Sequence, residues 1–210
     1  MYILIISLVT FFAALLTFFS GFGLGTILTP VMLIFFPAEI AISLTGIVHF
    51  SNNIFKLSIV GKNFDKTVLL KFGIPAILAS FIGAYALFYI SNNTFYKYNL
   101  FYQTFEVSYL DFIISIILII FALFDLIPFL NKIKFNKSIL PLGGFLTGFF
   151  GGLTGNQGAL RSAFLIKLNL ERTVFIATTV VISFFVDLTR IGIYASKINA
   201  FEISESLGFG

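Results

Sequence analysis

The sequence predicts an all-α membrane protein, a polytopic bundle of two internal repeats whose glycine-rich segments are broken helices. Of its 210 residues, 59% are hydrophobic and only 10% are charged, and the mean hydropathy is +1.05. A soluble domain has about 25% charged residues, so this chain has too few polar side chains to cover a water-facing globule. Most apolar runs are long enough to cross a bilayer, and two contain glycine-rich breaks.

The same composition excludes a soluble enzyme and a nucleic-acid-binding domain. The net charge is +4, but the thirteen Lys and Arg residues are scattered between apolar runs and form no basic cluster. Such charges are typical of loops that set membrane topology. The chain has no cysteine and one histidine, which excludes disulfides, Fe–S clusters and multi-histidine metal sites. We therefore expect no cofactor and no metal.

The elements follow from the apolar runs in chain order. Residues 2–36 form one apolar stretch broken by SGFGLG. The stretch lacks the Lys or Arg residues and the A-x-A cleavage site of a signal peptide, so we expect a retained membrane helix. Single spans are predicted at 39–60, 67–90, 108–130 and 172–194. Polar loops are predicted at 91–107 and 131–137. Residues 138–168 are apolar again and are broken by GGLTGNQG.

The order of these segments indicates an internal repeat. Gly25 and Gly158, which each close a glycine-rich break, are 133 residues apart. Polar positions repeat with an offset of 134, which pairs Asn53 with Asp187 and Lys56 with Arg190. The alternative is that this weak similarity arose by chance.

The repeat divides the chain into two transmembrane units. Residues 1–137 form the first, and residues 138–210 form a second that lacks the counterparts of the last two spans. We therefore expect 172–194 to expose an apolar face, in a truncated chain or a naturally short variant.

Loop charges orient the bundle. The basic loops at 61–66 and 131–137 are separated by two spans and so share a side, which the positive-inside rule places in the cytoplasm. The loop at 91–107 then lies outside. The location of the N-terminus depends on whether residues 2–36 cross once or twice, and loop charges do not decide between these.

The two breaks are candidate anion sites. Glycine lets backbone approach a ligand closely, and a helix that begins after a break points unpaired N–H groups and a positive dipole end toward it. Arg161 follows the second break by one helical turn and adds a permanent cation. The alternative is close helix packing, which we expect at Gly144 and Gly148. The candidate substrate-binding residues are Gly23, Gly25, Thr26, Gly155, Asn156, Gln157, Gly158 and Arg161.

A second polar group lies on the spans that follow the breaks. Charged residues inside a span usually face the bundle interior in pairs and mark a pathway. The candidate coupling or pathway residues are His49, Asn53, Lys56, Asp187 and Arg190. The alternatives are a structural Asp187–Arg190 pair, a hydrogen-bonded interior histidine, and a Lys56 side chain that snorkels to the membrane surface.

The two broken segments also carry a family resemblance. The stretches SGFGLGTILTPVML and GFFGGLTGNQGALRSAFLI, each followed by a span with polar residues, resemble the TauE/SafE family of sulfite-exporter-like permeases. FIGAYAL is similar to a glycine motif of that family's third helix. The glycine runs are shorter here than is usual in the family. Pro30 follows the first break, whereas the second repeat has Ser162 or Ala163 at that place.

The resemblance implies two four-helix repeats and the transport, typically the export, of small sulfur-containing anions such as sulfite or organosulfonates. We therefore predict a secondary transporter of a small anion in the bacterial inner membrane. Its expected partners are the anionic substrate and membrane lipid but not nucleic acid, and a homo-oligomer is left open. An enzyme is not expected, because the sequence has no H-E-x-x-H, G-x-S-x-G or acid dyad. The alternative function is a membrane assembly or scaffold protein without a transported substrate.

Overall fold

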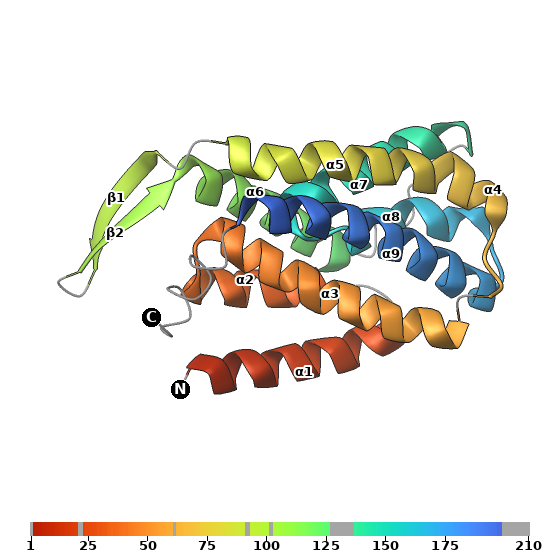
Figure 1. Ribbon diagram of the computed structural model, residues 1–210, viewed down its shortest axis with the longest axis horizontal. Coiled ribbons are helices and arrows are strands. Elements are labelled where there is room, and N and C mark those ends of the chain that lie inside the picture. The colour runs from red at the N-terminus through yellow and green to blue at the C-terminus, as the bar shows by residue number, and fades with distance from the viewer. Residues whose placement is uncertain are drawn as a thin grey trace.

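The computed structural model describes residues 2–20, 23–60, 62–90, 93–100, 103–126 and 137–198. Most of these residues are helical, and the longer helices lie roughly along one axis, with a β-hairpin projecting from one end of the bundle (Figure 1). Two helical runs, Lys66–Tyr89 and Arg172–Lys197, are long and apolar enough to cross a membrane by their length and composition.

The N-terminal part consists of α1 (Tyr2–Ser20), α2 (Leu24–Phe35) and α3 (Ala38–Val60). The Lys56 ammonium near the end of α3 donates to the Thr17 carbonyl near the end of α1, so these two helices run in the same direction. Short links join α2 to the end of α1 and to the start of α3, so α2 runs back between them. Residues 2–36 therefore form an antiparallel helical pair. Of the first break, Gly21 and Phe22 lie outside the described residues.

The next span is a continuous helical run of α4 (Lys66–Val68), a π-helical turn η1 (Leu69–Gly73) and α5 (Ile74–Tyr89). Asp65 begins it, because its carboxylate accepts the Val68 amide at 2.9 Å and so satisfies one free N–H of the first turn. The helix α6 (Tyr109–Leu126) follows. Asp111 exchanges hydrogen bonds with Ser108 at its start and so marks that end of the helix. The Asp125 side chain lies outside the description.

The prediction that residues 91–107 form a loop without regular structure is wrong. It forms an antiparallel hairpin of β1 (Thr94–Leu100) and β2 (Gln103–Ser108), so the protein is not strictly all-α. The segment is polar but rich in Tyr, Phe and Thr, which favour extended strands. Lys97 lies opposite Glu106 and donates to it across the hairpin.

The second broken segment is a helical hairpin. It consists of a short turn η3 (Lys137–Ile139), then α7 (Leu140–Thr154), α8 (Gly158–Leu165) and a turn η4 (Ile166–Leu168). Leu140 at its start and Phe164 and Leu165 near its end pack in one cluster with Val68, so both ends lie at the same end of the bundle. At 1.5 Å per residue α8 is about 12 Å long, which is too short to cross a bilayer. The segment therefore returns to the end of the bundle at which it begins.

The last helix, α9 (Arg172–Lys197), packs antiparallel to α3. Gly46 lies against Tyr194, whereas Asn53 near the other end of α3 contacts Asp187. The described chain leaves a strip of α9 uncovered, which consists of Phe185, Leu188, Gly192 and Ala195. The sequence predicts such a face on this span, but the interpretation of the chain as an incomplete repeat stays a prediction.

The closest helix contact joins α5 and α7, which run in parallel. Gly144, Gly148 and Gly152 lie against the carbonyl oxygens of Phe72, Ala76 and Ser80, at places where a Cβ atom would overlap them. Small residues four apart allow this approach of two backbones. The packing role expected for Gly144 and Gly148 is confirmed.

Candidate functional site

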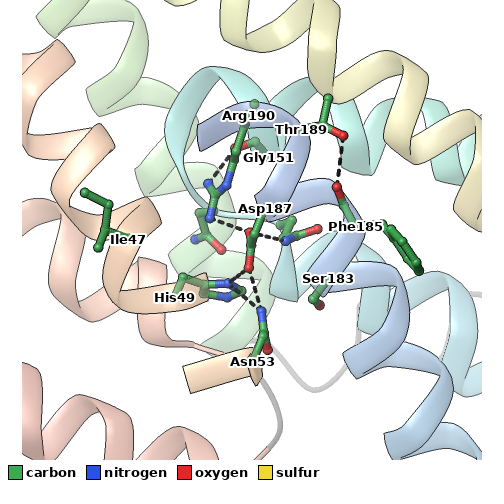
Figure 2. A network of polar contacts seen from close by, with 12 residues as sticks. Ile47, His49, Asn53, Gly151, Ser183, Phe185, Asp187, Thr189 and Arg190 are labelled. Atoms are coloured by element: carbon green, nitrogen blue, oxygen red, sulfur yellow. Dashed lines mark hydrogen bonds and ion pairs between the residues drawn. The ribbon is translucent and has the colours of Figure 1, made fainter. Parts of the chain in front are cut away.

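The Asp187 carboxylate is the centre of a buried polar network between α3, α7, α8 and α9 (Figure 2). Its Oδ2 atom lies 2.7 Å from His49 Nδ1 and accepts the Asn53 amide at 2.6 Å. Its Oδ1 atom accepts the Gln157 amide at 3.0 Å. Oδ1 is also 2.7 Å from Arg190 Nη2, a close ion pair whose angle does not fit a hydrogen bond. Donors therefore surround the carboxylate, which favours its ionised form.

One face of α9 supplies most of this network. Ser183, Asp187, Arg190 and Tyr194 are spaced by four, three and four residues, which places them along one side of a helix. All four are buried. Asp187 and Arg190 were predicted from the sequence, whereas Ser183 and Tyr194 were not, although the same helical spacing marks both.

Arg190 and Tyr194 also hold the end of α7. Arg190 Nη1 donates to the Gly151 carbonyl at 2.9 Å, and the Tyr194 hydroxyl donates to the Gly152 carbonyl. The last carbonyls of a helix have no partner within it, and its C-terminal end carries partial negative charge. The Gly151 carbonyl already accepts the Gly155 amide at 3.1 Å, so the guanidinium is its second donor. The positive charge of Arg190 also offsets the negative end of the dipole, so Arg190 serves both Asp187 and the end of α7.

The two breaks lie against each other inside the bundle. A Cβ atom at Gly25 would lie 3.1 Å from the Gly155 carbonyl oxygen, so Gly25 allows a close approach. The Asn156 side-chain amide donates to the Thr26 hydroxyl at 3.0 Å. Gly23 and Gly155 have φ values of +101° and +77°, which favour glycine. The starts of α2 and α8 are thus brought together, and neither has a side-chain cap.

Arg161 lies on α8, one turn after the second break, with only 3% of its surface exposed. Its Nη1 donates to the Ser183 hydroxyl, and Ser183 in turn donates to the Thr179 carbonyl at 2.8 Å. Among the described residues, the Nε atom has no hydrogen-bond partner. In the part of the chain that the structure describes, no carboxylate lies within ion-pair distance of Arg161. The Arg161–Asp187 pairing that would make this arginine purely structural is therefore not formed.

Lys56 is the second buried cation without a carboxylate partner among the described residues. It is 8% exposed, and its ammonium donates to the Thr17 carbonyl at 2.9 Å. The alternative prediction, that the Lys56 side chain snorkels to the membrane surface, is therefore not observed. Because the partner of Lys56 is a main-chain carbonyl, its residue type gives no sign of the contact in the sequence. Asn52, on the same helix, does not join the network.

The buried charges of the site do not balance. Lys56, Arg161 and Arg190 carry three positive charges, and Asp187 is the one buried carboxylate among the described residues. Burying a charge without a counter-charge costs several kcal/mol, so such an excess is typical of a site that binds an opposite charge. The donors present are guanidinium, ammonium, amide and hydroxyl groups, which all suit an oxyanion.

The comparisons with known proteins agree with this chemistry. The model of the sulfite exporter TauE/SafE family matches residues 6–208, nearly the whole chain. No curated protein and no solved structure matches it. The family is one of membrane permeases, as the apolar helices and the resemblance of the two broken segments both indicate. This chain belongs to the sulfite exporter TauE/SafE family.

Proposed function

We propose that this protein is a secondary transporter that exports a small sulfur-containing anion, such as sulfite or an organosulfonate. The observation that carries the proposal is the excess of buried positive charge at Lys56 and Arg161. A bound anion offsets this charge, and family membership indicates its sulfur chemistry.

The proposed anion site lies where the two breaks meet. The first turns of α2 and α8 direct free N–H groups and positive dipole ends toward this point. The unpartnered Arg161 Nε atom supplies a charged donor beside them. Further contacts are assigned to the candidate residues Gly23, Gly25, Thr26, Gly155, Asn156, Gln157 and Gly158.

Residues 1–137 and 138–210 are proposed to act as two repeats of opposite orientation. The directions of the helices support this. The helices α1, α2 and α3 run alternately up and down the bundle, and α7, α8 and α9 also alternate but begin in the opposite direction. Inverted repeats that meet at broken helices suit alternating access to a central site. Asn53, Asp187 and Arg190 then lie where α3 and α9 move against each other, and His49 and Lys56 line the same pathway.

The proposed orientation follows from the basic loops. The end of α3, the start of α4 and the start of α7 lie at the end of the bundle opposite the β-hairpin (Figure 1). The positive-inside rule puts that end in the cytoplasm of a bacterial inner membrane. Because α1 and α2 are antiparallel, the N-terminus then lies outside, together with the hairpin.

Flux measurements test this proposal. The purified protein is reconstituted in liposomes loaded with sulfite, thiosulfate, sulfate or a taurine-like sulfonate, and anion efflux is recorded under an imposed membrane potential. We expect saturable efflux of at least one sulfur oxyanion, and none from protein-free liposomes. If liposomes with and without the protein leak every anion at the same rate, inward and outward, transport is refuted and an assembly role is favoured.

A further inference from the structure

His49 is the single histidine of the chain, and it contacts the Asp187 carboxylate, which also accepts the Gln157 amide of the second break. Its side chain is only 12% exposed, and Nδ1 is 2.7 Å from Asp187 Oδ2. Asn53 Nδ2 also lies 2.9 Å from Nδ1, but this amide already donates to Asp187 Oδ2 at 2.6 Å. A carboxylate accepts hydrogen bonds and donates none, so we assign the hydrogen of Nδ1 to its contact with Asp187. Any change in the charge of His49 therefore takes place at Nε2, which has no partner among the described residues.

Asp187 is poorly suited to bind that proton itself. Its two oxygens are contacted by four N–H-bearing groups, those of His49, Asn53, Gln157 and Arg190. A protonated carboxyl would have to turn a hydrogen toward one of these donors and lose its contact. The ring of His49 is thus the group of this network that can gain a proton without breaking a hydrogen bond.

The charges that face His49 make its protonation depend on the anion site. Arg190 acts on it from α9 and Arg161 from α8, and Lys56 lies two turns away on α3 itself. The helices α1 and α2, which also pack against α3, carry no Asp, Glu, Lys or Arg. The positive charge that the ring gains on protonation is repelled by the arginines and attracted by Asp187. A bound anion beside Arg161 adds attraction and tips this balance toward the imidazolium.

We propose that His49 binds one proton at Nε2 when the anion site fills, so that the protein is a proton–anion symporter. This inference rests on the proposed function and adds the coupling ion to it. Binding linkage is reciprocal, so the anion must raise the proton affinity of His49 by the factor by which the proton raises anion affinity. We expect about a tenfold effect, within the usual range for coupled sites.

The single histidine makes a direct test practical. The whole protein is labelled with ring-15N histidine, placed in lipid nanodiscs and titrated by NMR with and without sulfite. The two ring nitrogens distinguish the Nδ1–H neutral form from the imidazolium. We expect the neutral form to be Nδ1–H, and sulfite to move the midpoint of the titration up by about one pH unit, which corresponds to the tenfold effect. An identical titration with and without sulfite, in protein that transports sulfite, overturns the proposal.

Flux in liposomes gives the second readout. We expect wild-type sulfite efflux to carry protons with it, as reported by a trapped pH dye, and His49→Gln to lower the number of protons moved per sulfite. Asn52→Ala, one helix position from the network, serves as the control that keeps both fluxes. Equal proton flux in wild type and His49→Gln overturns the coupling and leaves the transport proposal standing. If wild type moves no anion at all, the proposed function fails and the symport fails with it. Where His49→Gln does not fold, the wild-type NMR titration decides.

Discussion

Arg190 and Asp187 lie one turn apart on α9 and form a fully buried ion pair, with 2.7 Å between Nη2 and Oδ1. The same arginine holds the Gly151 carbonyl at the end of α7, and the same carboxylate holds Asn53 of α3. The pair therefore joins three helices of the bundle. Its charges satisfy each other, which leaves Arg161 and Lys56 as the cations available to an anion.

The first prediction concerns this pair. Asp187→Asn keeps the size of the side chain but removes the counter-charge of a fully buried arginine. Breaking a buried ion pair from one side costs about 3–5 kcal/mol. We expect a strong loss of thermal stability in detergent, measured by circular dichroism. The control is Glu106→Gln in the exposed pair with Lys97, which should change stability little. Equal melting of the two variants would contradict the structural role.

The second prediction uses glycines on two helices. In Gly148→Ala the new Cβ would lie 2.6 Å from Ala76 Cα, and a backbone atom cannot rotate away. Overpacking of this kind costs about 1–3 kcal/mol, which outweighs the gain of about 1 kcal/mol from replacing glycine in a helix. Gly192→Ala on α9 meets nothing within 4 Å and should be neutral or stabilising. Thermal unfolding compares them, and a stabilised Gly148→Ala would show that α5 and α7 do not pack so closely.

The spans and their polar face could be predicted from the sequence, because each depends on local spacing. Apolar runs gave α3 and α9 within a few residues of their observed bounds. Helical spacing placed Asp187 and Arg190 on one face, and the same rule would have added Ser183 and Tyr194. The family was predicted from the two broken segments, and the family match over residues 6–208 confirms it.

Features that depend on contacts between distant segments could not be predicted in this way. The return of α8 toward Leu140 is set by the packing of Phe164 against Gly143, which no local pattern contains. The Lys56 partner is a main-chain carbonyl, so residue type gave no signal. The β-hairpin was missed because its polar residues predicted a loop, while its aromatic residues favour strands.

The third prediction tests the contact between the two breaks. The chain has no cysteine, so an introduced pair reports one distance without background. Thr26 and Asn156 are joined by a side-chain hydrogen bond of 3.0 Å. We expect the double variant Thr26→Cys with Asn156→Cys to cross-link under mild oxidation in membranes, as seen by mass spectrometry. Each single variant is the control. A double variant that stays reduced under conditions that oxidise a surface pair would place the breaks apart.

The fourth prediction concerns the hairpin outside the bundle. Hydrogen bonds from Lys97 and Thr94 lower the pKa of the Glu106 carboxyl below its ordinary value. A lowered pKa in the folded state means that the pair stabilises the hairpin above the ordinary pKa of glutamate. This contribution is lost as the pH falls through the folded pKa. Hydrogen exchange of the hairpin amides should therefore show weaker protection at acid pH, after correction for intrinsic rates. Glu106→Gln should remove the pH dependence of this protection. If protection in Glu106→Gln still depends on pH, a group other than Glu106 is responsible.

The last prediction separates an anion-binding role of Arg161 from a structural one. Arg161 is buried and donates from Nη1 to the Ser183 hydroxyl, and its Nε atom has no partner in the described part of the chain. Arg161→Gln removes the charge, so anion efflux from liposomes should stop. The fold should survive, because the buried positive charge that is lost has no carboxylate partner within the described residues. Arg161→Lys keeps the charge but lacks the planar pair of donors, so binding should weaken and remain measurable. Ser183→Ala is the matched control, since it removes the hydroxyl partner and leaves the charge. If Arg161→Gln transports at the wild-type rate, the anion does not bind at this residue. If it unfolds and Asp187→Asn restores it, Arg161 instead balances the charge of the Asp187 network.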